Sequence, residues 1–139
     1  MTIERTLALI KPDAVAARNR DAIINRIKEN GFTIIAEANM TLSLKEAQAF
    51  YQEHIGKSFF DELVNFISSG SLTALVLEKE AAITSWRSLM GATNFKEAAK
   101  GTIRADFATS INNNAVHGSD SEQSAQREIC FFFRGLELI

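Results

Sequence analysis

The order of strand-like and helix-like segments constrains what this chain can fold into more than any other feature of its sequence. A short apolar run from Arg5 to Ile10 stops at Lys11-Pro12, and because proline interrupts strand pairing we place a strand end there. Asp21 to Asn30 has apolar residues on one helical face, and Gly31 follows where a helix C-cap is expected. With a second strand over Phe32 to Ala36, this part of the chain predicts a β-α-β unit.

The next part of the chain predicts a pair of helices, a third strand and a further helix. Ser43-Leu44-Lys45-Glu46 is a capping box, which opens a helix running to about His54. Phe60 to Ile67 carries apolar residues at positions i, i+3, i+4 and i+7, so we predict a second short helix there. Leu72 to Leu77 is a continuous apolar run of strand length, and Ala81 to Met90 is helical.

A long polar connection and a short end segment complete the pattern. Gly91 to about Ala115 is punctuated by glycine, and connections of this length in a compact domain are usually functional. We predict a short helix from Ser121 and a closing strand from Glu128 to Arg134, a stretch rich in phenylalanine. Two β-α-β halves favour a single α+β domain over residues 1–139. We expect a ferredoxin-like sandwich: a four-stranded antiparallel sheet covered by helices, with an inserted helical pair and a long loop.

Composition and charge exclude several classes of protein. The 139 residues are 46% apolar and 23% charged, as in ordinary globular domains, so a disordered or fibrous chain is disfavoured. The 15 Lys and Arg against 17 Asp and Glu give a net charge of −2, whereas generic nucleic-acid binders carry a basic excess. A small anionic ligand held by a few local cations is compatible with this balance.

Three further features favour a cytoplasmic protein. The longest apolar runs are far shorter than the ~20 residues of a membrane helix. The N-terminus lacks the basic region and apolar core of a signal peptide. The single cysteine, Cys130, cannot form an internal disulfide, and its apolar neighbours predict a buried thiol in a reducing compartment.

Two familiar kinds of site are disfavoured by their spacing. Gly56-Lys57-Ser58 is like the end of a phosphate-binding Walker A loop, but that pattern needs a preceding strand and a glycine where this chain has Tyr51. The two histidines, His54 and His117, belong to no Cys/His cluster with metal-ligand spacing, so a zinc site is disfavoured. We expect His54 to be solvated at the end of its helix.

His117 is a candidate nucleophile. It lies in Asn114-Ala115-Val116-His117-Gly118-Ser119-Asp120, which we expect to be a polar loop before a helix, with Gly118 easing the turn. A neutral imidazole is a competent nucleophile near pH 7 when one ring nitrogen is free and the other is held by an acceptor. Glu128, downstream, is a candidate for that acceptor. A surface histidine in a hydroxyl-rich turn is the competing interpretation of the same residues.

Three cations are candidates for binding phosphate. Lys11 ends the first predicted strand, Arg87 lies on a predicted helix, and Arg104 lies in a turn. Each alone is typical of a solvated surface charge. Together with Thr93 they would suit a polyphosphate, since arginine offers forked donors and lysine a compact charge. Phe59 would either stack on a base or pack in the core. Sequence spacing leaves both questions open.

Four blocks of the sequence resemble the nucleoside diphosphate kinase family. Residues 114–121, NAVHGSDS, resemble the family's active-site signature N-x-x-H-G-S-D, whose rare residue choices at fixed spacing make the match specific. The opening ERTLALIKPDAV (4–15), the GATN turn (91–94) and the GTIRADF loop (101–107) also resemble family blocks, in the family's order. The resemblance spans nearly the whole chain.

The resemblance implies the same ferredoxin-like sandwich and a defined activity. The family moves the γ-phosphate of a nucleoside triphosphate, typically ATP, to a nucleoside diphosphate, and so maintains nucleoside triphosphate pools. The implied mechanism is ping-pong through a phosphohistidine, with Mg²⁺ held mainly by the nucleotide phosphates. The resemblance also implies a homo-oligomer, tetramer or hexamer as in the short bacterial type, with no membrane and no nucleic acid required.

Position by position, the resemblance also assigns roles to residues. His117 matches the phosphorylated histidine, and Glu128 and Ser119 match the residues that orient it. The family's phosphate-contacting positions match Lys11, Arg87, Thr93 and Arg104. Its ribose contact matches Asn114, its base-stacking position matches Phe59, and its tyrosine beside the histidine matches Tyr51. Since stacking holds the base, little discrimination among bases is expected.

Two positions depart from the family pattern, and two other functions compete with it. Many relatives have proline where this chain has Lys100 and Ser58, which bears on assembly and heat stability. A ferredoxin-like single-stranded nucleic-acid binder would suit the fold, but it needs exposed strand aromatics in a basic setting, and Arg5 to Ile10 has none. A phosphohistidine relay protein would accept phosphate on His117, but it has no need of base and ribose contacts.

Overall fold

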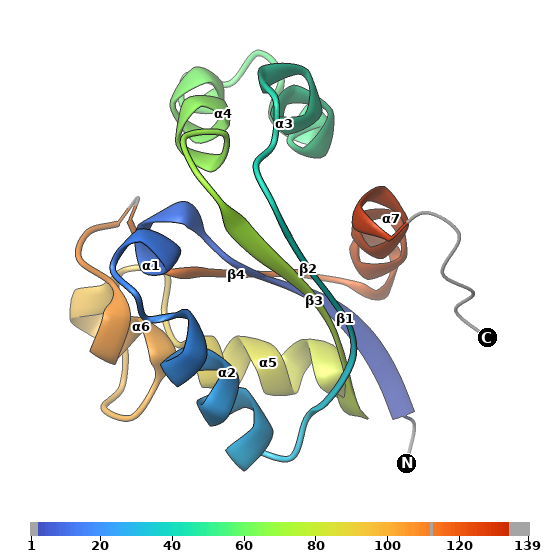
Figure 1. Ribbon diagram of the computed structural model, residues 1–139, viewed down its shortest axis with the longest axis vertical. Helices are drawn as coiled ribbons and strands as arrows, with labels where there is room; N and C mark the ends of the chain where they lie inside the picture. The colour runs from blue at the N-terminus through green and yellow to red at the C-terminus, as the bar shows by residue number, and fades with distance from the viewer. Residues whose placement is uncertain (1–2, 112, 134–139) are drawn as a thin grey trace.

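The computed structural model describes residues 3–111 and 113–133, which form one antiparallel sheet with helices on both faces (Figure 1). The strands pair in the order β2-β3-β1-β4, with bounds β1 Ile3–Ile10, β2 Thr33–Met40, β3 Leu72–Glu80 and β4 Val116–Gly118. The helices are α1 Pro12–Ala16, α2 Arg20–Glu29, α3 Leu44–Phe50, α4 Phe60–Ile67, α5 Ala82–Met90, α6 Ile103–Phe107 and α7 Glu122–Phe132, with 3₁₀ turns η1 Gln52–His54 and η2 Phe95–Glu97. The predicted α+β sandwich, with its inserted helical pair α3 and α4, is confirmed.

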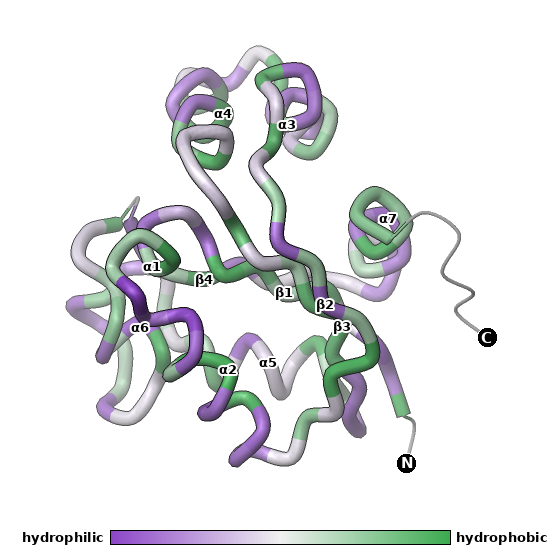
Figure 2. Tube along the Cα trace, in the orientation of Figure 1, coloured by the Kyte–Doolittle hydropathy of each residue, from purple (hydrophilic) through white to green (hydrophobic). Residues whose placement is uncertain are grey.

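The inner strand β1 separates two layers of core, because successive side chains of a strand point to opposite faces. Ala8 and Ile10 belong to the layer formed with α2 and α5, whereas Leu7 and Leu9 belong to the layer formed with α3, α4 and α7. In Figure 1 these two groups of helices lie on opposite sides of the sheet. Apolar residues gather along the strands where the layers meet (Figure 2).

Several predicted boundaries are confirmed by the structure. The hydroxyl of Ser43 accepts the backbone N–H of Glu46, whose carboxylate accepts the N–H of Ser43, so the capping box opens α3. Gly31 follows α2 with a φ of +86°, which favours glycine. However, α3 ends at Phe50, and η1 then carries the chain to His54.

The predicted closing strand is wrong. Residues Glu128 to Phe132 belong to α7, which opens where the hydroxyl of Ser121 accepts the N–H of Ser124. The buried residues of α7 are Ala125, Glu128 and Ile129, which lie on one helical face. Arg134, the last residue of the predicted strand, lies outside the described residues.

The fourth strand lies instead where a loop was expected. β4 pairs with β1, and it places His117 opposite Leu9. The long connection before β4 contains η2 and α6, and Pro12 begins α1 as well as following a strand. Cys130 is exposed on α7, so the prediction of a buried thiol is wrong. Among the described helices, none is long and apolar enough to cross a membrane.

Candidate active site

His117 lies on the edge strand β4, where neighbouring groups fix its backbone. The residue pairs with Leu9 of β1, and its carbonyl accepts the indole N–H of Trp86 at 3.1 Å. Gly118 is outside the positive-φ region, but a Cβ at this position would lie 2.5 Å from Cδ1 of Trp86. The glycine is therefore needed for the close approach of Trp86, and not for the turn that was expected.

The imidazole of His117 is held by one carboxylate. Glu128 on α7 is buried, and its Oε1 lies 2.8 Å from Nε2 of His117. The same oxygen accepts the hydroxyl of Ser119 at 3.0 Å, and Ser119 is fully buried. Because an ionised carboxylate can only accept, this contact favours the neutral tautomer that donates from Nε2 and keeps the lone pair on Nδ1. The structure therefore provides one held and one free ring nitrogen.

A cavity of about 130 Å³ adjoins the imidazole. Besides His117 and Glu128, its lining includes Phe50, Tyr51, Glu53, His54, Arg87, Asp120, Ser124 and Arg127. Burial and the neighbouring Glu128 raise the pKa of Tyr51, so this side chain stays a neutral phenol. His54 is partly exposed, as expected for a solvated residue at a helix end, and its Nδ1 lies 3.0 Å from the ammonium of Lys57.

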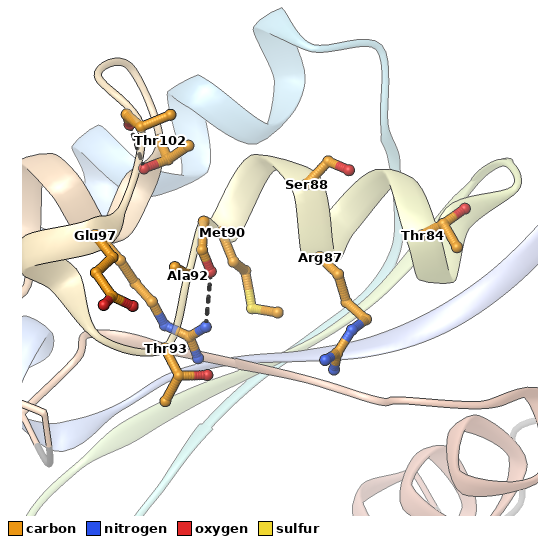
Figure 3. A pocket seen from close by; sticks show the side chains of 11 residues that line it. Thr84, Arg87, Ser88, Met90, Ala92, Thr93, Glu97 and Thr102 are labelled. Atoms are coloured by element: carbon orange, nitrogen blue, oxygen red, sulfur yellow. Dashed lines mark hydrogen bonds between the residues drawn. The ribbon is translucent and has the colours of Figure 1, made fainter.

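A larger cavity of about 640 Å³ shares Arg87 with the first one. In Figure 3 Arg87 projects from α5 toward the side on which Thr93 lies. Arg104 also lines this cavity, and its guanidinium donates to the carbonyls of Gly91 and Val116, each at 3.0 Å. Burial, and to a lesser extent Arg87, lowers the pKa of Arg104 to about 10. Two neighbouring guanidinium groups thus line a space that suits an anion.

Lys11 and Asn114 are buried polar residues near this region. Burial lowers the pKa of Lys11 to about 8; Asp13 opposes this shift and Arg104 adds to it, so Lys11 lies within electrostatic range of Arg104. Asn114 donates its amide N–H to the carbonyl of Ile111 at 2.9 Å, but its buried Oδ1 has no hydrogen-bond partner among the described residues. Such an unsatisfied oxygen is typical of a ligand contact.

Phe59 lies apart from both cavities. It lines a separate small groove with residues of α4, including Leu63 and Phe66, and its ring centre is 5.4 Å from that of His54. The residue is 43% exposed, which contradicts the interpretation that it packs in the core. The structure therefore brings His117, Glu128, Tyr51 and Arg87 together around one cavity, with buried Ser119 bonded to Glu128. Arg87, Thr93 and Arg104 line the other cavity, whereas Lys11, Asn114 and Phe59 line neither.

The sequence reasoning missed Arg127, which lines the cavity of His117 and donates to the carbonyl of Phe50 at 3.1 Å. Because a strand was predicted from Glu128 onward, Arg127 was not expected to lie on the same helix as Glu128. The helix start at Ser121 was predicted and is confirmed; the unused signal was Ala125 and Ile129 at helical spacing, which extends that helix past Glu128.

Comparisons with known proteins agree on one family. The family model described as nucleoside diphosphate kinase matches residues 4–138. A curated nucleoside diphosphate kinase of Syntrophotalea carbinolica is 52% identical over 137 residues, covering 99% of this chain and 100% of that protein. The solved nucleoside diphosphate kinase of Aquifex aeolicus superposes with a TM-score of 0.95 at 44% identity, covering 99% of this chain and 100% of that one. The solved nucleoside diphosphate kinase of Encephalitozoon cuniculi superposes with a TM-score of 0.90 at 35% identity, covering 94% of this chain and 88% of that one.

Proposed function

The chain belongs to the nucleoside diphosphate kinase family, and from that premise we propose that His117 carries phosphate between two nucleotides. Membership of this family makes the chain a phosphotransferase that acts on nucleotides, and favours neither a relay protein nor a single-stranded nucleic-acid binder. The observation that carries the proposal is the 2.8 Å contact between Nε2 of His117 and Glu128, beside a cavity that includes Arg87.

The held and free nitrogens of His117 define the two half-reactions. In the first, the lone pair of Nδ1 forms a bond to the γ-phosphorus while the bond to the bridging oxygen breaks, and the diphosphate leaves with that electron pair. The ring gains positive charge, which Glu128 stabilises through the Nε2–H bond while Ser119 donates to the same oxygen. In the second, a terminal oxygen of another diphosphate forms a bond to the phosphorus, and Nδ1 leaves with its electron pair.

The remaining side chains suit the parts of a nucleotide. We assign phosphate contacts to Lys11, Arg87, Thr93 and Arg104, a ribose contact to Asn114, base stacking to Phe59, and a place beside the histidine to Tyr51. The two arginines line one cavity, where both can contribute to binding an anion. Phosphoryl transfer depends mainly on such positioning and charge stabilisation.

Mg²⁺ fits this site as a companion of the nucleotide. Among the described residues lining the larger cavity, Glu97 is the one carboxylate, beside Arg87 and Arg104. Magnesium usually keeps several waters and takes one or two carboxylates together with substrate phosphates, so this donor set suits an ion held mainly by the phosphates. When bound, the ion neutralises phosphate charge.

We further propose that residues 1–139 form one domain of a cytoplasmic homo-oligomer, tetramer or hexamer. The support is the likeness to the short bacterial type, whereas the two departures from that type bear on how stable the assembly is. Ser58 and Lys100 are both exposed, on turns before α4 and before α6, where a proline would restrict the backbone. Light scattering during gel filtration measures the assembly size.

A two-step labelling experiment tests the role of His117. Mixing the protein with γ-labelled ATP and Mg²⁺ should give an acid-labile, alkali-stable phosphate on His117, and unlabelled GDP should then discharge it as labelled GTP. His117→Ala should abolish both steps, at least a 10³-fold loss, because His117 is the imidazole held by Glu128. His54 lines the same cavity, but its Nδ1 lies against the ammonium of Lys57. Circular dichroism of this variant should match the wild type. Label on another residue, or label that GDP does not remove, would contradict the proposal.

A further inference from the structure

Arg127 lines the cavity of His117 but has no role in the reaction as described above. It precedes Glu128 on α7, so two adjacent residues of one helix reach the surroundings of the imidazole. Its Nη2 donates to the backbone carbonyl of Phe50 at 3.1 Å, and its Nε lies 3.5 Å from the carboxylate of Glu53. The guanidinium is therefore directed at the end of α3.

The carbonyl of Phe50 is a group that needs an outside donor. Phe50 is the last residue of α3, and the last carbonyls of a helix have no partner within that helix. A cation at a helix C-terminus also interacts favourably with the helix dipole. Arg127 meets both conditions, and so it fixes the end of α3 to α7.

The residue at that end of α3, Phe50, packs its ring against the imidazole of His117. The ring of Phe50 stands edge-to-face to that of His117, with centres 5.4 Å apart and an angle of 72° between the planes. Phe50 is 2% exposed, so its ring is held in the packed core. Because the phenyl ring of Phe50 has no hydrogen-bonding group, it restricts the His117 ring by packing alone.

We propose that Arg127 is a positioning residue for phosphate transfer, acting on His117 through Phe50. Glu128 fixes one ring nitrogen by a hydrogen bond, and Arg127 holds the end of α3 so that Phe50 keeps the ring from turning away from that bond. This inference rests on the proposed role of His117. The competing use of a cation here is direct contact with a nucleotide phosphate, which would affect binding instead of orientation.

The first test uses Arg127→Met in the full chain, since Met keeps much of the apolar stem but removes the donor. We expect the rate of His117 phosphorylation at saturating ATP to fall about tenfold, because small displacements of a reacting group are costly. The ATP concentration at half-saturation should change by less than about twofold. Arg127→Lys should recover most of the rate, since an ammonium can donate to the Phe50 carbonyl.

A matched control removes an arginine of similar exposure elsewhere. Arg5 is 26% exposed against 30% for Arg127, and its ion pair with Glu78 involves no described residue that lines either cavity. Arg5→Met should therefore phosphorylate at the wild-type rate. A similar loss in both variants would show a general effect of removing an arginine and would overturn the proposal.

Nitrogen NMR of His117 separates positioning from a general loss of stability. The wild type should show mainly the tautomer protonated at Nε2, and Arg127→Met should increase the other tautomer. Phe50→Leu leaves Arg127 in place and should cause a similar loss of rate. The double variant should then be no slower than the slower single variant, because both act through one contact.

The outcomes decide between the alternatives. The proposal would be overturned if Arg127→Met kept the wild-type rate or an unchanged tautomer ratio, or if it changed only the ATP concentration at half-saturation. It would also be overturned if Arg127→Lys did not recover the rate. If Arg127→Met does not fold, Phe50→Leu decides, and a wild-type rate in that variant would overturn it. Failure of the proposed function looks different, because label would then not reach His117 in the wild type.

Discussion

His117 and Phe59, which we propose to serve the reacting and the base end of one nucleotide, are held in different ways. The imidazole is bonded to buried Glu128 at 2.8 Å, and Ser119 fixes the same carboxylate. Phe59 is 43% exposed and has ring contacts only with His54 and the ammonium of Lys57 among the described interactions. Bond formation needs one fixed geometry, whereas stacking on a base tolerates many. The firmly held His117 fits a single reaction, and the loosely held Phe59 fits the use of nucleotides with different bases.

Replacing the carboxylate at the histidine end should have the larger effect. Glu128→Gln removes the charge that stabilises the ring cation and allows an amide N–H to face Nε2, so we expect kcat to fall about 10²-fold, the lower end of what acid–base and tautomer control contribute. KM should change little. Steady-state and rapid-quench kinetics measure both, and Glu122→Gln, an exposed glutamate of α7, is the matched control. A main effect on KM would place Glu128 in nucleotide binding instead.

The buried lysine Lys11 should show an intermediate, pH-dependent effect. Lys11 has its pKa lowered to about 8 in the free protein, so it is protonated below this pH and neutral above it. Because a phosphate contact needs the ammonium, the affinity for ADP should weaken about tenfold over about one pH unit above 8. Calorimetric titrations across this range measure it. Lys11→Met should bind ADP more weakly below pH 8 and lose the step, and a step that persists in this variant would assign it to another group.

Removing the ring at the base end should have the smallest effect. Phe59→Ala should raise KM by about fivefold, since stacking on one base contributes about 1 kcal/mol at its lower end. The increase should be similar for ADP, GDP, CDP and UDP, with kcat nearly unchanged. Phe59→Tyr keeps an aromatic face and should behave as the wild type. A large drop in kcat would mean that the base end also sets the reacting geometry, and the contrast between the two ends would fail.

Local signals in the sequence were sufficient where one short segment decides the structure. The capping box at Ser43 opens α3, Gly31 follows α2 with a positive φ, and α4 runs from Phe60 to Ile67 as its apolar spacing predicts. These features depend on residues three or four positions apart. The α+β class and the first three strands followed from their order, whereas the fourth strand was predicted at the wrong segment.

The errors lie where distant contacts override local preference. Glu128 to Phe132 is rich in residues that favour strands, and a short apolar run cannot be assigned by periodicity alone, so α7 was missed there. β4 has three residues and exists because β1 pairs with it. For the same reason no spacing could show that Arg87 would link two cavities, or that Arg127 would reach Phe50.

The approach of Trp86 to Gly118 has a practical consequence. Trp86 is the one tryptophan of the sequence, it is fully buried, and its indole N–H is bonded to the peptide carbonyl of His117. The chain therefore contains an intrinsic fluorophore that is hydrogen-bonded to the backbone of His117, the residue whose side chain changes charge during the proposed turnover. Its emission offers a label-free, real-time signal for each half-reaction.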